Sequence, residues 1–184
     1  MTTTEFIIIV LVVALVLLAA VWAVGRRKRT ERLRGKFGPE YGRAVEERGG
    51  PAKAEEALHQ REKRVEHYDL KPLSPGDRRD FGQEWERLQA MFVDSPKDAT
   101  TRADALIGHV MSTRGYPEGP FDQRLEDLSV EHAEAVQGYR AAHEVALRRA
   151  SGEATTEDMR QAMIGYRRLL DELLGANETM RQAS

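Results

Sequence analysis

The sequence predicts an all-α protein made of one N-terminal transmembrane helix, a charged juxtamembrane helix and an antiparallel bundle of about four helices. Three observations support this prediction. Residues 6–24 form an unbroken apolar run, the other apolar residues recur at helical spacing, and Pro, Ser and Gly mark where helices would begin and end. The chain has no cysteine, which excludes a disulfide framework, a thiolate metal site and a cysteine nucleophile.

The apolar run contains no charged side chain. As a helix it would cover roughly 28 Å, close to the hydrocarbon thickness of a bilayer of about 30 Å. We therefore expect residues 1–25 to be a transmembrane anchor, with the lipid bilayer as a partner. A cleaved signal peptide is the alternative, but it fits less well because no basic segment precedes the run and no A-x-A cleavage site stands out.

A basic collar follows at residues 26–36, where Glu31 is the only acidic residue. Basic flanks face the cytoplasm, so we expect the N-terminus outside and the C-terminal domain in the cytoplasm. The basic side chains can contact anionic lipid headgroups at about 1 kcal/mol each, or they only set the orientation. They are Arg26, Arg27, Lys28, Arg29, Arg32, Arg34 and Lys36. The overall charge of −2 leaves the rest of the chain acidic, so no nucleic-acid partner is expected.

Residues 37–71 are predicted to be a charged helical stalk or lid. Pro39 suits the first position of a short helix that ends at Gly49, and Pro51 suits the first position of the next. The stripe of apolar side chains in residues 51–69 is narrow and is interrupted by Arg61. We expect a solvated helix here. A lid on the bundle and self-association through residues 51–69 are the alternatives.

Residues 72–175 are predicted to form the bundle, because each of its four helices has an apolar stripe along one face. The helices are expected at residues 75–93, 96–114, 129–150 and 156–174. The candidate N-caps are Ser74, Ser95, Ser129 and Thr155 or Thr156. Residues 115–129 are expected to be irregular, with a turn of helix near residues 123–128, and the tail at residues 176–184 to be flexible.

A rigid turn follows the second bundle helix, in the sequence RGYP. Its Gly can adopt positive φ, and its Arg can interact with the negative end of the helix dipole. The aromatic side chains either close the end of the bundle, which we favour, or mark a docking loop for a protein partner. The residues concerned are Arg114, Tyr116, Pro117 and Phe121.

Three side chains share one helical face and could line a small-ligand site inside the bundle: His132, Tyr139 and His143. Within one helix the two histidines lie about 16 Å apart, so they cannot share a metal ion. We favour hydrogen-bonded residues at the edge of the core. No nucleophile, base and orienting group occur together, and no Gly-rich phosphate loop is present. We therefore expect no catalytic residue, cofactor or metal site, and no enzyme.

Six sequence segments follow one another along the chain in this order: RLRGKFGPEYGRAV, WERLQAMFVDSP, RGYP, LSVEH, YRAAH and TTEDMRQAMIGYRRL. Over residues 26–174 the chain resembles a family of small single-pass membrane proteins of unknown activity found mostly in actinobacteria, some of them described as secreted. The resemblance implies an anchor, a basic collar and a helical cytoplasmic domain at the bacterial inner membrane, and it carries no site residue. The expected function is a protein-interaction or structural module, with a small-ligand or metal sensing domain as the alternative.

Overall fold

The computed structural model describes residues 3–175, and the side chains of residues 11, 13 and 15–175. Within this part of the chain every regular element is an α-helix, so the all-α prediction is confirmed. The helices are α1 (Thr3–Phe37), α2 (Pro39–Arg48), α3 (Pro51–Glu66), α4 (Pro75–Asp94), α5 (Pro96–Thr113), α6 (Phe121–Leu128), α7 (Ala135–Ala150) and α8 (Thr156–Leu173). The tail predicted to be flexible, residues 176–184, lies outside the described residues.

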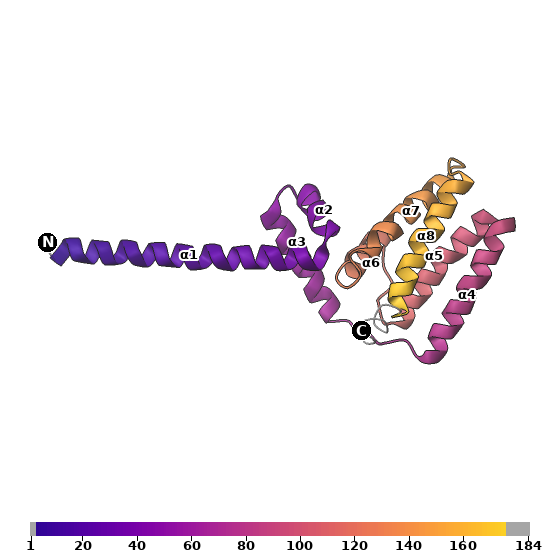
Figure 1. Ribbon diagram of the computed structural model, residues 1–184, viewed down its shortest axis with the longest axis horizontal. Helices are drawn as coiled ribbons and strands as arrows, with labels where there is room; N and C mark the ends of the chain where they lie inside the picture. Colours follow the sequence, from indigo (N-terminus) through magenta and orange to yellow (C-terminus); the bar gives the residue numbers. More distant parts are fainter. Residues whose placement is uncertain (1–2, 176–184) are drawn as a thin grey trace, which may run out of the picture.

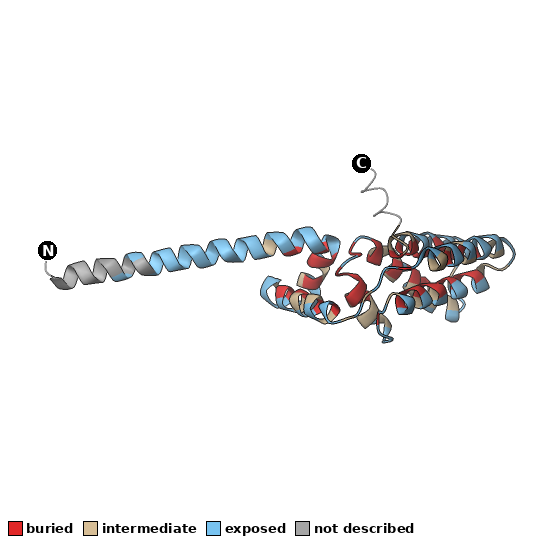
Figure 2. Ribbon diagram, turned by 90° about the horizontal axis from the view of Figure 1, so that it is seen from below, coloured by how far each residue is buried: buried red, intermediate tan, exposed pale blue. Residues whose placement is uncertain are grey.

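The longest helix, α1, joins the predicted anchor and the basic collar into one continuous rod (Figure 1). Its 35 residues span about 52 Å at 1.5 Å per residue. Most of the rod projects away from the other helices, and its side chains at positions 15–29 are all exposed (Figure 2). Only its last two turns are packed into the rest of the protein.

Among the residues that the structure describes, no helix is both long and apolar enough to cross a membrane. Part of the run predicted to be a transmembrane helix, residues 6–10, 12 and 14, lies outside the described side chains. The large apolar side chains of the run that are described are mostly exposed, among them Leu18 at 69% and Trp22 at 66%. The transmembrane anchor therefore remains a prediction.

The end of α1 packs with α2 and α3 into a small three-helix unit, which we call the head. Leu33 and Phe37 of α1 are fully buried and cover the narrow apolar stripe of α3. The head core consists of Leu33, Phe37, Tyr41, Ala44, Ala54, Leu58, Val65 and Val130. The expectation of a solvated helix at residues 51–69 is wrong, because Leu33 and Phe37 at the end of α1 supply the apolar surface that buries the α3 stripe.

The predicted helical bundle is confirmed, and it consists of two antiparallel hairpins, α4–α5 and α7–α8. The four helices lie side by side in the order α4, α5, α8, α7 (Figure 1). The ends of α5 and α8 meet at Arg114 and Leu173, so these two helices are parallel and the bundle is antiparallel only within each hairpin. The connection at residues 114–134, which contains α6, carries the chain past α5 before α7 begins.

The third long helix begins at Ala135 and not at Ser129, as expected. Ser129 follows α6 and donates its hydroxyl to the Glu126 carbonyl, 2.6 Å away, which closes a turn in place of capping a helix. The turn of helix expected near residues 123–128 is the eight-residue helix α6. In contrast, Ser74 and Thr155 each form the expected N-cap, and their backbone N–H groups donate in return to the carboxylates of Asp77 and Asp158.

Candidate functional site

A cleft of about 640 Å³ lies where the end of α1, the α3–α4 connection, the loop after α6 and the end of α8 meet; we call it the junction cleft. Its walls carry charges of both signs. The charged and titratable side chains that line it are Lys36, Lys71, Arg78, Arg114, Glu131, His132, Glu134 and Glu172. Two residues singled out by the sequence, Arg114 and His132, therefore share one cleft.

Arg114 is held at this cleft from both sides. Its carbonyl accepts a hydrogen bond from the Lys71 N–H, 2.9 Å away, and its guanidinium donates to the Leu173 carbonyl, 3.2 Å away. Leu173 ends α8, so the guanidinium lies at the negative end of the α8 dipole as well as that of α5. At the next position Gly115 has φ 94, and a Cβ there would collide with the Asp69 carbonyl. The RGYP turn thus packs directly on the α3–α4 connection.

Tyr116, in the same turn, is buried, with 4% of its surface exposed. Its hydroxyl donates to Glu131, 3.4 Å away, and its ring packs edge-on against Tyr68. Burial and the negative charge of Glu131 raise the pKa of Tyr116 well above its ordinary value. Pro117 is exposed beside it. This arrangement matches the structural interpretation of the turn, while the docking of a partner stays a prediction.

His132 lies in the loop before α7, with Nδ1 3.1 Å from Glu172 Oε2. Burial and the positive charge of Arg114 lower the pKa of His132 to about 4, so the ring is neutral at pH 7. A neutral ring that donates its Nδ1–H to Glu172 has an acceptor at Nε2. This Nε2 is buried and has no hydrogen-bond partner among the described residues. The His132 ring is therefore a polar group in the wall of the cleft, and its second nitrogen has no partner in the described part of the chain.

The other sequence candidates gather elsewhere, at the contact between α6 and α7. Phe121 stacks on His143 with ring centroids 3.4 Å apart, and Tyr139 lies 5.2 Å from Phe121. Tyr139 is fully buried against Tyr166, and burial raises the pKa of both phenols. The three residues of the predicted ligand lining therefore do not surround one site. His132 lines the junction cleft, whereas Phe121 packs against Tyr139 and His143.

A buried ionic cluster between head and bundle was not predicted from the sequence. Glu40 of α2 is 2% exposed and accepts hydrogen bonds from Gln137, at 2.6 Å, and Arg140, at 3.1 Å. Arg61 of α3 is 5% exposed, lies 3.8 Å from Glu40, and pairs with Glu126 at 3.1 Å. The one available signal was Arg61 itself, a charge in the middle of an apolar stripe.

A second part of this cluster lies toward the α3–α4 connection. Arg64 bridges Asp127 at 2.7 Å and Glu126 at 2.9 Å, and the Tyr68 hydroxyl donates to Asp127 at 2.9 Å. Although burial opposes it, the charges of Arg61 and Arg64 hold the pKa of Glu126 below its usual range. The head is thus fastened to α6 and α7 by charge-assisted hydrogen bonds as well as by apolar contact.

The basic collar divides into two parts. Lys36 and Arg32 both pair with Glu62 of α3, at 2.9 and 2.8 Å, and Arg34 lies over the Tyr41 ring. Burial would raise the pKa of Glu62, but hydrogen bonds from these two cations lower it to about 2. Lys36 also lies about 18 Å beyond the end of the apolar run along the helix. The farther part of the collar therefore contributes to the head, and contact of the seven basic residues with anionic lipids stays a prediction.

No group of three or more metal-binding side chains is arranged around a common point in the part of the chain that the structure describes. No protein-family model, curated protein or solved structure matches the chain. The resemblance to actinobacterial single-pass membrane proteins therefore stays a prediction.

Proposed function

We propose that this protein is a membrane-anchored structural or protein-interaction module, which holds its bundle at a fixed height and orientation over the bacterial inner membrane. The observation that carries the proposal is the continuity of α1 from the apolar run into the head core. Leu33 and Phe37, both fully buried, belong to the same helix as the apolar run. The described residues therefore connect the predicted anchor to the head through continuous helix, with no flexible linker between them.

The exposed apolar side chains of α1 support the proposal that this part of the helix is not surrounded by water. Four consecutive residues, 15–18, have large apolar side chains, each more than 60% exposed. Since successive residues of a helix point about 100° apart, four in a row cover all sides of the rod. A helix that is apolar all round is normally surrounded by other protein or by lipid. The sequence run at residues 6–24 has the length for lipid, and the basic flank favours a cytoplasmic bundle.

The spacing between membrane and domain is short and stiff. Leu33 is the ninth residue after Val24 in the same helix, which places it about 14 Å farther along the axis. Beyond that point the Glu40–Arg140 and Arg61–Glu126 pairs connect the head to the bundle. The direction of α1 is thereby transmitted to the bundle, so one surface of the bundle would face a partner at the membrane. Tethering would also raise the local concentration of the domain there.

Insertion and orientation can be tested with single cysteines, because the native chain has none. Thr4→Cys and Val93→Cys are each expressed in full-length protein and treated with a membrane-impermeant maleimide on intact spheroplasts. The proposal predicts that the protein resists carbonate extraction. It also predicts that position 4 is labelled in intact spheroplasts and that position 93 is labelled only after lysis. Extraction into the soluble fraction, or the opposite labelling pattern, would contradict it.

A second function is favoured by one observation: His132 lines the junction cleft, and its buried Nε2 has no hydrogen-bond partner among the described residues. The cleft volume lies within the range of small-ligand sites, about 300–1,000 Å³. We propose it as a site for a small anion with a hydrogen-bond donor, bound by Arg78, Arg114 and His132. A thermal-shift screen of hydroxy acids and phosphate monoesters tests this. Stabilisation that is lost in His132→Phe supports the site, and a flat profile for the unmodified protein removes it.

A further inference from the structure

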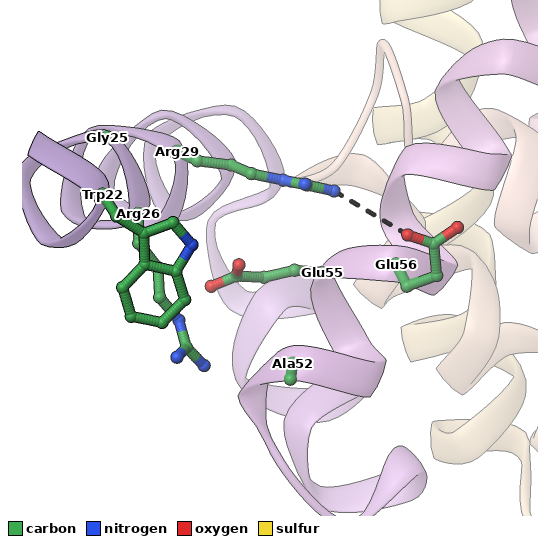
Figure 3. A pocket seen from close by; sticks show the side chains of 7 residues that line it. All are labelled: Trp22, Gly25, Arg26, Arg29, Ala52, Glu55 and Glu56. Atoms are coloured by element: carbon green, nitrogen blue, oxygen red, sulfur yellow. Dashed lines mark ion pairs between the residues drawn. The ribbon is translucent and has the colours of Figure 1, made fainter. Parts of the chain in front are cut away.

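A notch of about 560 Å³ lies between α1 and the first turns of α3, just beyond the apolar run (Figure 3). One face of α1 and one face of α3 line the notch. Gly25, which has no side chain, lies in the middle of the α1 face and leaves space there. An added Cβ at Gly25 would meet nothing within 4 Å. The lining residues are Trp22, Gly25, Arg26, Arg29, Ala52, Glu55 and Glu56.

The two arginines of the notch are available to a ligand. The Arg26 guanidinium lies over the Trp22 ring, 5.4 Å from its centroid, and Figure 3 shows the Arg29 side chain extending separately toward Glu56. Arg29 reaches Glu56 only at 3.9 Å, much farther than the 2.8 Å pair of Arg32 farther along the same helix. A phosphate group suits two guanidinium groups one helical turn apart, because each can donate two hydrogen bonds to its oxygens.

The notch also holds fixed negative charge. Glu55 is 6% exposed, and its carboxylate accepts hydrogen bonds from the Thr30 hydroxyl at 2.6 Å and the Tyr41 hydroxyl at 3.1 Å. Figure 3 shows this carboxylate extending from α3 toward the α1 face. Glu56 lies at the opposite side of the notch, and a hydrogen bond from Gln60 keeps its pKa below the ordinary value. A purely anionic ligand would meet two carboxylates here, whereas a zwitterion with an ammonium group would be matched by them.

We propose that this notch binds the headgroup of an aminophospholipid, with its phosphate at Arg26 and Arg29 and its ammonium at Glu55 and Glu56. The inference depends on the membrane anchoring proposed above. It is consistent with depth, since Trp22 is typical of the membrane interface and Arg29 lies about 8 Å beyond Val24. The polar layer of one leaflet is roughly 5–8 Å thick, so the notch would lie within and at the outer edge of the headgroups.

The test is native mass spectrometry of the full-length protein released from nanodiscs that contain equal amounts of phosphatidylethanolamine, phosphatidylglycerol and phosphatidylcholine. We expect retained phosphatidylethanolamine to exceed each of the other two lipids by at least fivefold. The preference should disappear in Arg26→Gln/Arg29→Gln. It should persist in the control Arg27→Gln/Lys28→Gln, which removes the same charge from exposed positions that do not line the notch.

The carboxylates are tested separately with Glu55→Gln, which keeps an acceptor for Tyr41 and Thr30, and with Glu56→Gln. Each should lower the preference for phosphatidylethanolamine over phosphatidylglycerol. A preference for phosphatidylglycerol in the unmodified protein would overturn the site. An equal loss of lipid preference in Arg26→Gln/Arg29→Gln and in the control Arg27→Gln/Lys28→Gln would overturn it as well. Displacement of the lipid by soluble phosphoethanolamine at an equal concentration would also overturn it, because the ligand would then need no bilayer.

Incorporation into nanodiscs is recorded for every variant. Failure of the unmodified protein to enter nanodiscs refutes the proposed anchoring, and with it the lipid site. Incorporation without any lipid preference refutes the lipid site alone.

Discussion

The α7 and α8 backbones approach each other closely where the two helices cross, and a single methyl group there should destabilise the bundle. Gly138 and Gly165 face each other at this crossing. A Cβ built on Gly165 would lie 2.8 Å from the Gly138 carbonyl carbon, 3.3 Å from its Cα, and closer still to its oxygen. Ordinary contact begins at 3.4 Å, so Gly165→Ala requires α7 and α8 to move apart by about 1 Å.

The expected magnitude follows from two opposing effects. Overpacking of this kind costs about 1–3 kcal/mol, and here the obstructing group is backbone, which cannot turn aside. Replacing Gly by Ala inside a helix contributes about 0.5–1 kcal/mol in the opposite direction. We expect a net loss of about 2 kcal/mol, which corresponds to a fall in Tm of roughly 4–8 °C for a protein of this size.

Thermal unfolding of the full chain, followed by circular dichroism, measures this effect. Gly82→Ala in α4 is the matched control, because a Cβ there meets nothing within 4 Å. The control should gain about 0.5–1 kcal/mol, so the two identical substitutions are expected to change Tm in opposite directions. A Tm for Gly165→Ala equal to or above that of Gly82→Ala would refute the close crossing of α7 and α8.

Three further substitutions test the head, the cleft and a helix cap. Glu40→Ala leaves the buried charge of Arg61 and the half-buried charge of Arg140 without this partner and should cost about 3 kcal/mol in urea unfolding; a loss below 1 kcal/mol would contradict the buried cluster. The pKa of His132 is about 4 when folded and 6.5 when exposed, so unfolded chains bind more protons between these values. Stability should therefore fall by up to about 3 kcal/mol as the pH drops from 6.5 to 4, and His132→Gln should flatten this part of a Tm–pH curve; an unchanged slope would contradict the burial of the ring. Thr155→Ala removes the N-cap of α8 and should cost about 1 kcal/mol, whereas Thr156→Ala, one residue later, should be nearly neutral.

The elements that the sequence predicted well are those determined by local chemistry. Proline at a first helical position marks the start of α2, α3, α4 and α5, and the caps at Ser74 and Thr155 satisfy backbone groups within the same turn. The predicted apolar stripes of α4 and α8 do face the core, where Trp85 and Tyr166 are buried. These features need no knowledge of which helices become neighbours.

What the sequence did not predict depends on contacts between distant segments. The α3 stripe looked too narrow to be buried because its partner surface, Leu33 and Phe37, lies at the basic end of a helix that was judged by its apolar half. The parallel contact of α5 with α8 follows from where α6 carries the chain, which spacing alone cannot show. Ser129 resembled an N-cap, but its hydroxyl bonds backward to Glu126.

The candidate site was predicted only in part, for the same reason. Arg114 and His132 were chosen separately, one as a helix end and one as part of a helical stripe. The structure places both at the junction cleft because the loop before α7 turns His132 toward the end of α8. Glu172, the partner of His132, lies 40 residues away in the chain and had no distinguishing pattern of its own.

The most direct test of the account is the distance between the collar and the far end of the bundle. Arg27→Cys and Val93→Cys place two spin labels on exposed positions of the otherwise cysteine-free full chain, which is reconstituted in bilayers. If α1 transmits its direction to the bundle, pulsed electron paramagnetic resonance should give one narrow distance distribution. Insertion of a short Gly-Ser segment after Thr30 should broaden it. A distribution in the uninterrupted protein as broad as that of the insertion variant would contradict the rigid coupling of anchor and bundle.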